Sequence, residues 1–571
     1  MHKETILSSA NKWLSSTFDK DTQQQVLELV NSNTKELEES FYKHLEFGTA
    51  GLRGIMGVGT NRINKYTLGK ATQGLSNYLN QKYKGDITVA IAYDCRHNSD
   101  SFAKIVADIF TANHIKVFLY EGMRPTPQLS FTVKYLNCKA GIVLTASHNP
   151  PNYNGYKVYG DDGAQIVTPE DDKIINEILK VDYSDIKFEG NDALLQYISQ
   201  EVDTAFINAS IQNMRVPLSN RNDLKIVFTS LHGTAIKLMP ELFERAGYQN
   251  VHFVAQQREP NGNFPTVNSP NPEEPEAFKM ALELAEKVNA DIVIATDPDA
   301  DRLGVAVRDL QGKLRQLNGN ETMTILTAFL IKKWHNQNRI DGNQFVVSTI
   351  VSTNLIAEIA KYNNVQHKIC LTGFKWIAKL IKDSKHLEFI GGGEESFGYM
   401  PGDYVRDKDA ISASLLACEI AAEAKSRGSS IFMELLQLYK THNFFKEHLI
   451  ALVKTGMDGA KQIEDLMRTF RTNPLHEIDG EAVRFVLDYQ SSIKKDLLTG
   501  ISVAIDLPKS NVLIFITEKG TKLALRPSGT EPKIKFYISV NQPLESIEDY
   551  QKVEDTLKNK ISRIACSLNN L

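Results

Sequence analysis

Short apolar runs rich in β-branched residues alternate along this chain with longer stretches of helical periodicity. The runs are too short and too apolar for surface helices, so they predict buried strands. The stretches between them, such as residues 276–289 and 321–334, predict helices. This alternation predicts the α/β class with mixed, mostly parallel sheets. The predicted strands span residues 87–93, 140–144, 225–229, 291–295 and 344–348.

The C-terminal part of the chain has a different pattern. Four strand candidates follow one another over residues 501–505, 512–517, 522–525 and 533–540, and a helix is predicted over 545–559. Strands in succession rather than in alternation with helices predict an α+β domain. Upstream of it, residues 409–426 predict an amphipathic helix that ends before Gly428.

Three of the predicted strands run directly into polar loops, in the segments GIVLTASHNP, DIVIATDPDADR and LEFIGGGEESFG. Ligands bind outside the carboxyl ends of strands in α/β sheets, so three similar α/β domains facing one cleft are expected. The predicted domains span residues 1–212, 213–318, 319–450 and 451–571. Residues 217–223, 309–320 and 441–459 are the predicted linkers.

Charge and composition narrow the functional classes. The 571 residues carry a net charge of −4, which gives no footprint for nucleic acid or an anionic membrane. Five cysteines without C-x-x-C spacing argue against a disulfide framework or structural zinc and fit a reducing cytoplasm. No apolar run is long enough to span a bilayer. We therefore expect a cytoplasmic protein, a monomer or weak homodimer, with a small-molecule partner.

Ser147 lies in the loop TASHNP directly after a predicted strand, where we expect its hydroxyl to be exposed. Such a hydroxyl can act as a nucleophile or carry a phosphoryl group. A serine in a turn, however, often has only a structural role, in which its hydroxyl hydrogen-bonds to the nearby backbone. The adjacent His148 is not expected to complete a triad, because neighbouring side chains rarely face each other.

Asp297, Asp299 and Asp301 alternate in the loop DPDADR. Alternate residues of an extended loop share a face, so the three carboxylates can converge on one hard cation. An EF-hand is excluded, because Arg302 and Arg308 stand where it needs Gly and Glu. A phosphatase with Asp297 as nucleophile remains a competing interpretation.

Two further loops have binding chemistry. GGGEESFG (391–398) offers carboxylates and a hydroxyl that suit vicinal sugar hydroxyls. RPSGTEPK (526–533) offers a guanidinium, two hydroxyls and successive amides to an anion. Arg53, in the Gly-rich segment 47–59, is another candidate anion contact. There is no Walker A motif and no protein-kinase motif set, so the combination suggests phosphoryl transfer on a phosphosugar.

TASHNP, DPDADR, GEESFG and RPSGTEP, in this order, resemble the four signature loops of the α-D-phosphohexomutase superfamily. FGTAGLRG and TGFKWI resemble its phosphoglucomutase and phosphomannomutase branch. The resemblance implies three similar α/β domains and a C-terminal domain like the TATA-binding protein, arranged around a central cleft. It also implies reversible phosphoryl transfer between the two ends of a hexose phosphate, through a phosphoserine and a 1,6-bisphosphate.

The resemblance assigns roles to individual residues. It implies that Ser147 carries the phosphoryl group and, with the three aspartates, holds Mg²⁺. Glucose 1,6-bisphosphate would be the intermediate and activator. Proton-transfer candidates are His148 and Lys375, and Arg53, Lys157 and Arg302 would neutralise charge. The predicted substrate contacts are Arg302, Glu394, Ser396, Arg526, Ser528, Gly529 and Thr530.

Phe374 departs from the TGHK form of some branches, which leaves Lys375 open as either base or sugar ligand. The leading hypothesis is a mutase that interconverts glucose 1-phosphate and glucose 6-phosphate, with mannose phosphates as further candidates. A phosphopentomutase of the same family is the alternative. The Asp-nucleophile phosphatase and a non-catalytic sugar-phosphate sensor rank lower.

Overall fold

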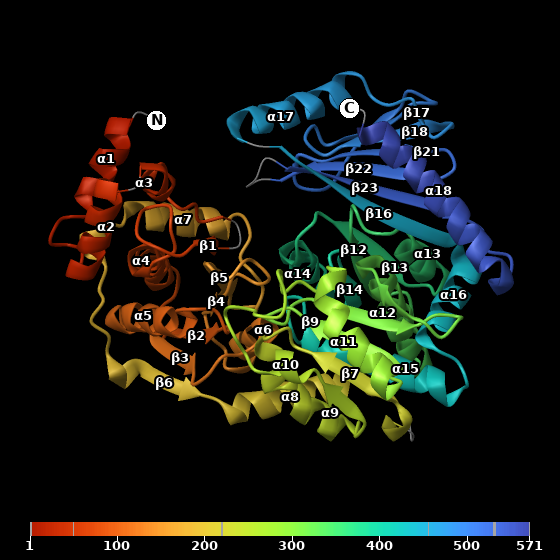
Figure 1. The fold of residues 1–571 in the computed structure, drawn as a ribbon, viewed down its shortest axis with the longest axis horizontal. Helices are drawn as coiled ribbons and strands as arrows, with labels where there is room; N and C mark the ends of the chain where they lie inside the picture. Colours follow the sequence, from red (N-terminus) through yellow and green to blue (C-terminus); the bar gives the residue numbers. More distant parts are fainter. Residues whose placement is uncertain are drawn as a thin grey trace. The chain divides into compact units, whose positions relative to one another are not determined.

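The computed structural model describes residues 3–32, 34–48, 51–217, 221–454, 456–528 and 533–569. It forms two compact units (Figure 1). The first contains Met1–Gly319, Phe374–Lys385 and Ser396–Gly428, and the second contains Asn320–Gly373, His386–Glu395 and Ser429–Leu571. Each unit is described by itself below.

One parallel three-stranded arrangement occurs three times. In each case the third strand along the chain pairs with the first, and the first pairs with the second, giving the orders β4-β2-β3, β9-β7-β8 and β14-β12-β13. This repetition confirms the prediction of three similar α/β sheets. The strands are β2 Thr88–Tyr93, β3 Lys116–Tyr120, β4 Ala140–Leu144, β7 Ile226–Thr229, β8 Val251–Phe253, β9 Ile292–Thr296, β12 Gln344–Thr349, β13 Gln366–Cys370 and β14 Glu388–Gly393.

The central strands are buried along their whole length, as the apolar runs predicted. Every residue of β4, β7, β9 and β12 is buried. Helices connect the strands, because parallel strands need crossover connections. These helices are α5 Ser99–Ala112, α6 Thr126–Tyr135, α9 Met239–Ala246, α10 Ala255–Arg258, α11 Pro275–Val288, α13 Leu355–Tyr362 and α14 Phe374–Asp383.

Antiparallel strands extend the first two sheets within the first unit. β5 pairs with β4 and with β1, and β10 pairs with β9 and with β11. β6 adds a parallel strand beside β3. The β10–β11 hairpin occupies much of 309–320, which the sequence predicted as a linker. These strands are β1 Gly51–Ile55, β5 Tyr153–Gly160, β6 Leu195–Ile198, β10 Leu303–Arg308 and β11 Leu314–Leu317. The short strand β15, Tyr399–Met400, is part of neither sheet.

An aromatic cluster joins the N-terminal helices to the first sheet's helices. Trp13 stacks on Phe18 with ring centroids 4.5 Å apart, and Tyr66 and Tyr183 meet both rings at an angle. Aromatic pairs add stability beyond their buried area. The helices of this region are α1 Lys3–Lys12, α2 Lys20–Ser32, α3 Thr34–Phe41, α4 Lys65–Lys82, α7 Glu170–Lys180 and α8 Gln200–Met214.

Helix α15 (Ala410–Ser426) is a core helix, so the predicted amphipathic character is wrong. Fourteen of its 17 residues are buried. Its polar positions are buried with partners: the N-cap Asp409 accepts from the amide and hydroxyl of Ser412, and the Glu419 carboxylate accepts from the Arg221 guanidinium at 2.6 and 2.7 Å. A helix that buries all faces needs such partners for every charge.

The C-terminal part of the second unit is an antiparallel sheet in the order β16-β23-β22-β21-β18-β19-β20. Side chains alternate along β22, so Leu523 and Leu525 lie on one face and Lys522 and Arg526 on the other. The strands are β16 Phe444–Val453, β17 Glu477–Ile478, β18 Glu481–Asp488, β19 Ile493–Asp496, β20 Ser502–Ala504, β21 Leu513–Thr517, β22 Lys522–Pro527 and β23 Lys533–Gln542.

Helices α17 and α18 cover the apolar face of this sheet (Figure 1). Phe470 of α17 meets Phe515 of β21 at 6.1 Å, and Tyr550 of α18 stacks on Phe444 of β16. In α18 the buried residues Val553, Leu557, Ile561, Ile564 and Leu568 recur at helical spacing. The remaining helices of the second unit are α12 Gly319–Asn336, α16 Ile431–His442, α17 Gly456–Thr472 and α18 Tyr550–Asn569.

The prediction of a linker over 441–459 is wrong, because β16 pairs with β23 over ten residues there. Charged residues break the apolar run, and an edge strand tolerates them because one side faces no partner strand.

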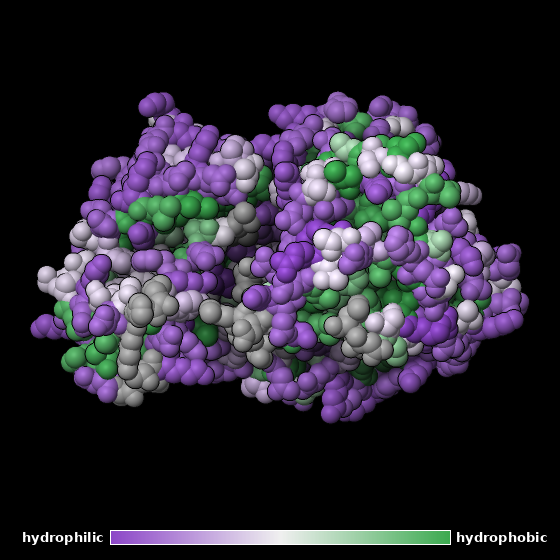
Figure 2. Space-filling model, turned by 90° about the horizontal axis from the view of Figure 1, so that it is seen from above, coloured by the Kyte–Doolittle hydropathy of each residue, from purple (hydrophilic) through white to green (hydrophobic). Residues whose placement is uncertain are grey.

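The four-domain division stays a prediction, as does the central cleft. Hydrophilic side chains cover most of the face shown in Figure 2, with hydrophobic ones gathered in patches between them.

None of the helices that the structure describes is long and apolar enough to cross a membrane.

Candidate active site

Ser147 lies in a strained turn just beyond the carboxyl end of β4. Its φ is +50°, a left-handed conformation that serine rarely adopts. Its amide donates to Thr145 Oγ1 at 2.8 Å, and its hydroxyl donates to Asp297 Oδ2 at 2.8 Å. Only 5% of the residue is exposed, so the expected exposed hydroxyl is wrong. The turn aims Ser147 at the aspartate loop instead of at solvent.

The guanidinium of Arg96 holds the Ser147 turn in place through hydrogen bonds to its backbone. It donates to the backbone oxygens of Ser147 at 2.5 Å, Pro150 at 2.8 Å and Tyr153 at 3.1 Å, and also to that of Asn149. A planar guanidinium with five donors suits such convergent acceptors. Sequence reasoning missed Arg96. The signal available was its place just after β2, at the same sheet edge as Ser147.

His148 faces Ser147 after all. The distance from Ser147 Oγ to His148 Nδ1 is 3.1 Å, so the expectation that neighbouring side chains would not meet is wrong. The left-handed turn brings the two side chains together. Burial and the charges of Arg302 and Arg53 hold the pKa of His148 well below its usual value, so the ring is neutral at neutral pH.

Asp297, Asp299 and Asp301 converge as predicted. One oxygen of each lies within 4.8 Å of the others, and all three residues are buried. Asp297 Oδ1 accepts from the amides of Asp301 at 3.0 Å and Arg302 at 2.9 Å, which closes the loop. Ala300 takes a left-handed φ of +55° between the last two aspartates. The loop therefore follows β9 and turns sharply enough to bring its alternate carboxylates together.

Two lysines balance the charge of these carboxylates. Lys157 Nζ lies 2.7 Å from Asp299 Oδ2 and 3.2 Å from Asp301 Oδ2, and Lys408 Nζ lies 3.1 Å from Asp301 Oδ2. Burial raises the pKa of Asp301, but Lys408, Lys157 and Arg302 outweigh burial and hold that pKa below its usual value. Burial and then the charges of Asp301 and Asp299 raise the pKa of Asp297. Lys408 stands in no recognisable motif and was missed by sequence reasoning.

The oxygens left over on this cluster fit a divalent cation. Asp299 Oδ1 and Asp301 Oδ1 are buried and accept no hydrogen bond from any residue that the structure describes. Their other oxygens are occupied, that of Asp299 by Lys157 and by Thr126 Oγ1 at 2.8 Å. Buried carboxylate oxygens without a partner are costly, and hard cations such as Mg²⁺ prefer such ligands. The acidic triad is therefore consistent with a metal site.

Arg53 and Arg302 flank the serine and aspartate loops. Arg53 Nη1 donates to Asn149 Oδ1 at 2.9 Å, beside Ser147 in the chain. The Arg302 guanidinium pairs with Glu273, and its backbone bridges to Gly398. Leu303 N also donates to Phe397 O at 2.9 Å. The aspartate loop is thus tied to the segment that carries Ser396.

Lys375 lies elsewhere in the first unit, in helix α14. It lines a cavity of about 240 Å³ together with residues such as Gln165, Thr168 and Lys173. Burial lowers the pKa of Lys375, while Asp171 opposes that shift. Its role as base or sugar ligand stays a prediction.

Two further predicted contacts, Glu394 and Arg526, lie in the second unit, whereas Ser396 belongs to the first. Glu394 is buried, and its Oε1 accepts from the amide of Gly373 at 2.5 Å. The neighbouring Glu395 uses Oε2 to accept from Thr349 Oγ1 and Ser352 Oγ, both at 3.0 Å. The two carboxylates of the GEESFG segment are therefore held by different parts of the sheet that contains β12.

Arg526 lies near the end of strand β22, and Ser528 follows that strand. Arg526 Nη1 lies 3.5 Å from Tyr537 Oη, and Ser528 N donates to Lys533 O at 2.7 Å across the hairpin. Burial and then Glu395 raise the pKa of Tyr537, and Arg526 opposes them. The GEESFG and RPSGTEP loops thus share one electrostatic environment. Gly529 and Thr530 lie outside the described residues.

Comparison with known proteins agrees with this geometry. Residues 44–185, 204–312 and 318–439 match the families described as phosphoglucomutase/phosphomannomutase, alpha/beta/alpha domains I, II and III. The chain is 41% identical over 515 residues to the phosphoglucomutase of Staphylococcus aureus strain MRSA252, covering 89% of this chain and 92% of that protein.

Two solved structures share the fold. One is the open form of parafusin, a phosphoglucomutase from Paramecium, with a TM-score of 0.66, 18% identity and coverage of 91% of this chain and 95% of that one. The other is a phosphoglucomutase/phosphomannomutase family protein from Burkholderia thailandensis, with a TM-score of 0.63, 19% identity and coverage of 90% and 97%. On the family matches and the 41% identity, this chain belongs to the phosphoglucomutase/phosphomannomutase family within the α-D-phosphohexomutases.

Proposed function

We propose that this protein is a phosphoglucomutase that interconverts glucose 1-phosphate and glucose 6-phosphate by way of a phosphorylated Ser147. The observation that carries the proposal is the 2.8 Å contact between Ser147 Oγ and Asp297 Oδ2 in a buried triad of aspartates. A serine held against a candidate cation site is placed for phosphoryl transfer. The 41% identity to a phosphoglucomutase supports glucose phosphates as the substrate class.

The reaction consists of two transfers. In the first, a sugar hydroxyl oxygen bonds to the phosphorus on Ser147 and passes its proton to a base, while the bond to the serine oxygen breaks and that oxygen takes up a proton. This forms glucose 1,6-bisphosphate, which we propose as intermediate and activator. After the bisphosphate turns round, the Ser147 oxygen bonds to its other phosphorus. That sugar oxygen leaves and takes up a proton.

We propose that His148 accepts the proton of the Ser147 hydroxyl when that oxygen bonds to phosphorus. Its Nδ1 lies 3.1 Å from Ser147 Oγ, and its lowered pKa keeps the ring neutral and able to accept a proton. Lys375 is the candidate for proton exchange with the sugar hydroxyl, since burial lowers its pKa toward neutrality. These assignments give each transfer a base and an acid.

Ser147, Asp297, Asp299 and Asp301 would hold Mg²⁺, which when bound neutralises negative charge on the transferring phosphoryl group. Lys157 and Arg53 add fixed positive charge from the protein. Lys157 also offsets the negative charge of Asp299 and Asp301, because its ammonium contacts both carboxylates.

The non-reacting phosphate needs a handle that serves both orientations of the sugar. Arg526, Ser528, Gly529 and Thr530 are the residues we assign to it, since a guanidinium, hydroxyls and amides suit a phosphate. Glu394 and Ser396 would read hydroxyls common to both orientations, and Arg302 would contact the substrate. Mannose phosphates are the next substrates to test. A monomer or weak homodimer in the cytoplasm is the expected state.

A coupled assay tests the proposal. Purified protein receives glucose 1-phosphate, mannose 1-phosphate or ribose 1-phosphate with Mg²⁺ and a trace of the matching bisphosphate, while free phosphate is followed. We expect glucose 6-phosphate to form without phosphate release, and Ser147→Ala to remove turnover by a factor on the order of 10⁴ or more. Phosphate release would favour Asp297 as nucleophile, and a preference for ribose 1-phosphate would favour the phosphopentomutase.

A further inference from the structure

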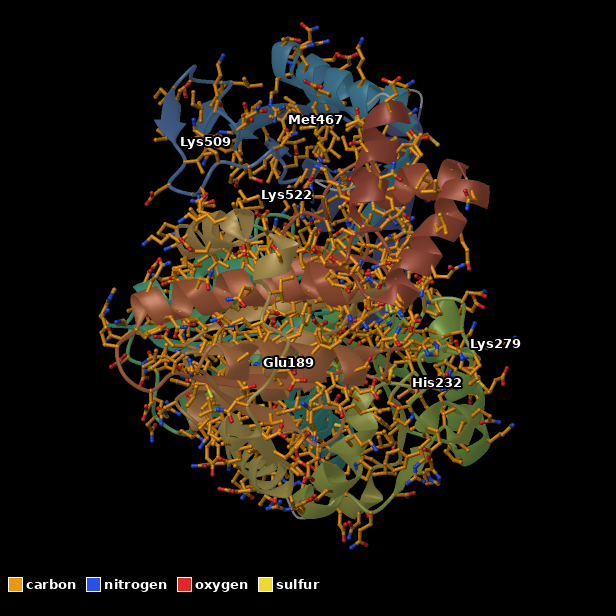
Figure 3. All side chains as sticks on the ribbon, turned by 90° about the vertical axis from the view of Figure 1, so that its left-hand side faces the viewer. Glu189, His232, Lys279, Met467, Lys509 and Lys522 are labelled. Carbon is orange, nitrogen blue, oxygen red and sulfur yellow. The ribbon has the colours of Figure 1, made fainter. Side chains whose placement is uncertain are left out.

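Lys522, labelled in Figure 3, is a buried lysine of strand β22. It is 4% exposed. Its Nζ donates to Ser352 O at 2.6 Å, to Asn354 Oδ1 at 3.1 Å and to Ile350 O at 3.5 Å. Lys522 therefore ties the antiparallel sheet to the loop between β12 and α13 inside the second unit.

The same loop holds Glu395. Ser352 accepts from Lys522 through its backbone oxygen and donates its hydroxyl to Glu395 Oε2 at 3.0 Å. Thr349 Oγ1 donates to the same oxygen, also at 3.0 Å. The hydrogen bonds form a continuous path from Lys522 through Ser352 to Glu395. Glu395 directly follows Glu394, the predicted sugar contact.

The other end of the path leads to the predicted phosphate handle. Lys522 and Arg526 are four residues apart on one strand, so their side chains lie on the same face, about 13 Å apart along it. On the neighbouring strand β23, Tyr537 lies on that face too, opposite Ala524, and contacts Arg526. The strand that carries Arg526 is thus fastened to the loop that holds Glu395.

We propose that Lys522, Ser352 and Glu395 are positioning residues that fix the spacing between the sugar contact Glu394 and the phosphate handle Arg526. The inference rests on the proposed function of the GEESFG and RPSGTEP loops and assigns Glu395 a role other than sugar ligand. Its carboxylate is already used by two hydroxyl donors, so it anchors the loop. A fixed spacing matters here because one sugar must be accepted in two orientations.

A lysine at this position has an energetic cost that packing alone does not explain. Burial lowers the pKa of Lys522 to about 8, although Glu447 and Glu395 oppose that shift. No ion pair forms on its ammonium within the described ranges. Methionine would fill the same space without desolvating a charge. The three donated hydrogen bonds are what the lysine adds, and all of them end in the loop next to Glu395.

A double-mutant cycle tests the path. Lys522→Met and Glu395→Gln are each expected to lower kcat/KM for glucose 1-phosphate about tenfold, mainly by raising KM. Because both act on one path, the double variant should lose about tenfold and not about a hundredfold. Lys446→Met is the matched control, since this lysine of β16 pairs with Glu554 of α18 on the opposite face of the sheet. It should leave KM unchanged.

Several outcomes would overturn the inference. They are a multiplicative loss in the double variant, or an unchanged KM in Lys522→Met with only a lowered Tm. If Lys522→Met fails to fold, Ser352→Ala replaces it in the cycle, because this variant loses the hydroxyl but keeps the backbone oxygen that accepts from Lys522. The inference then requires that Ser352→Ala raise KM and be non-additive with Glu395→Gln. Wild-type protein without turnover would contradict the proposed function itself, which separates the two failures.

Discussion

Lys157 and Lys522 are both buried lysines on strands, yet their surroundings differ. Lys157 contacts two carboxylates of the aspartate loop, whereas Lys522 contacts two backbone oxygens and an amide oxygen. Burial lowers the pKa of both, but Asp299 and Asp301 reverse the shift for Lys157 and raise its pKa. The pKa of Lys522 stays lowered, at about 8.

The difference separates two uses of a buried cation. Around Ser147 the protein gathers opposite charges, which is what a reaction that moves a phosphoryl group requires. Around Lys522 it uses neutral acceptors, which hold a loop in place through charge-assisted hydrogen bonds. We infer that the first region supplies the chemistry and the second supplies spacing. The predictions below test this division, from the largest expected effect to the smallest.

Asp299→Asn removes a candidate metal ligand from the charged region. We expect kcat to fall about 10³-fold, which corresponds to about 4 kcal/mol of lost stabilisation. The rise of Tm with added Mg²⁺ that we expect of the wild type should also disappear. Asp465→Asn, in an exposed pair with Arg468, is the control and should behave as wild type. If the Tm of Asp299→Asn still rose with Mg²⁺ as in the wild type, the aspartate triad would not be the Mg²⁺ site.

Arg96→Met removes the guanidinium that holds the Ser147 turn. It leaves backbone oxygens and the buried Asp94 carboxylate, which lies 3.4 Å from the Arg96 side chain, without their partner. Removing one member of a buried pair costs about 3 kcal/mol or more, so the free energy of unfolding in urea should fall by that amount. Arg468→Met on the surface should cost less than about 1 kcal/mol. Equal effects of the two substitutions would contradict the role of Arg96.

Lys157→Met and Lys522→Met compare the two lysines directly. Lys157→Met should lower kcat about 10²-fold, because Asp299 and Asp301 lose a counter-charge next to the reacting serine. Lys522→Met should act mainly on KM. Steady-state kinetics on glucose 1-phosphate measures both parameters. If both variants changed kcat and KM in the same ratio, the division between chemistry and spacing would fail.

The pH dependence of stability gives the smallest effect. The folded-state pKa of Lys522 is about 8 against an ordinary value of 10.5. Between these values the unfolded chain binds more protons, so folding stability from this group rises with pH. Wild type should gain about 1 kcal/mol relative to Lys522→Met between pH 8 and pH 9.

Urea unfolding of both proteins at the two pH values measures that difference. The charged groups that face Lys522 are Glu447 and Glu395, and both oppose the effect of burial on its pKa. His367, whose pKa burial lowers to about 4, is neutral throughout. A stability difference that falls with rising pH would contradict the assigned surroundings of Lys522.

Much of the fold could be predicted because the central strands are buried on both faces. Such strands appear in the sequence as continuous apolar runs, and polar loops directly after them mark the sheet edges where Ser147 and the three aspartates lie. Strands β16, β18 and β19 were missed, because charged residues interrupt their apolar pattern. Helix α15 was misinterpreted, because its polar residues are buried with partners that the sequence pattern does not show.

The candidate site divides in the same way. The aspartate loop could be predicted because its ligands are close in the chain. Arg96, Lys408 and Thr126 could not, since their partners are brought near only by folding. The contact between Ser147 and His148 depends on a left-handed backbone at Ser147, which no residue preference for serine would predict.

The central claim is that Ser147 carries the phosphoryl group. The most direct measurement is mass spectrometry of the peptide that contains Ser147, after the protein has been incubated with glucose 1,6-bisphosphate and then with excess glucose 1-phosphate. We predict that the bisphosphate adds one phosphoryl group at Ser147, and that the glucose monophosphate removes it. A phosphoryl group on Asp297, or none on either residue while turnover proceeds, would contradict the account.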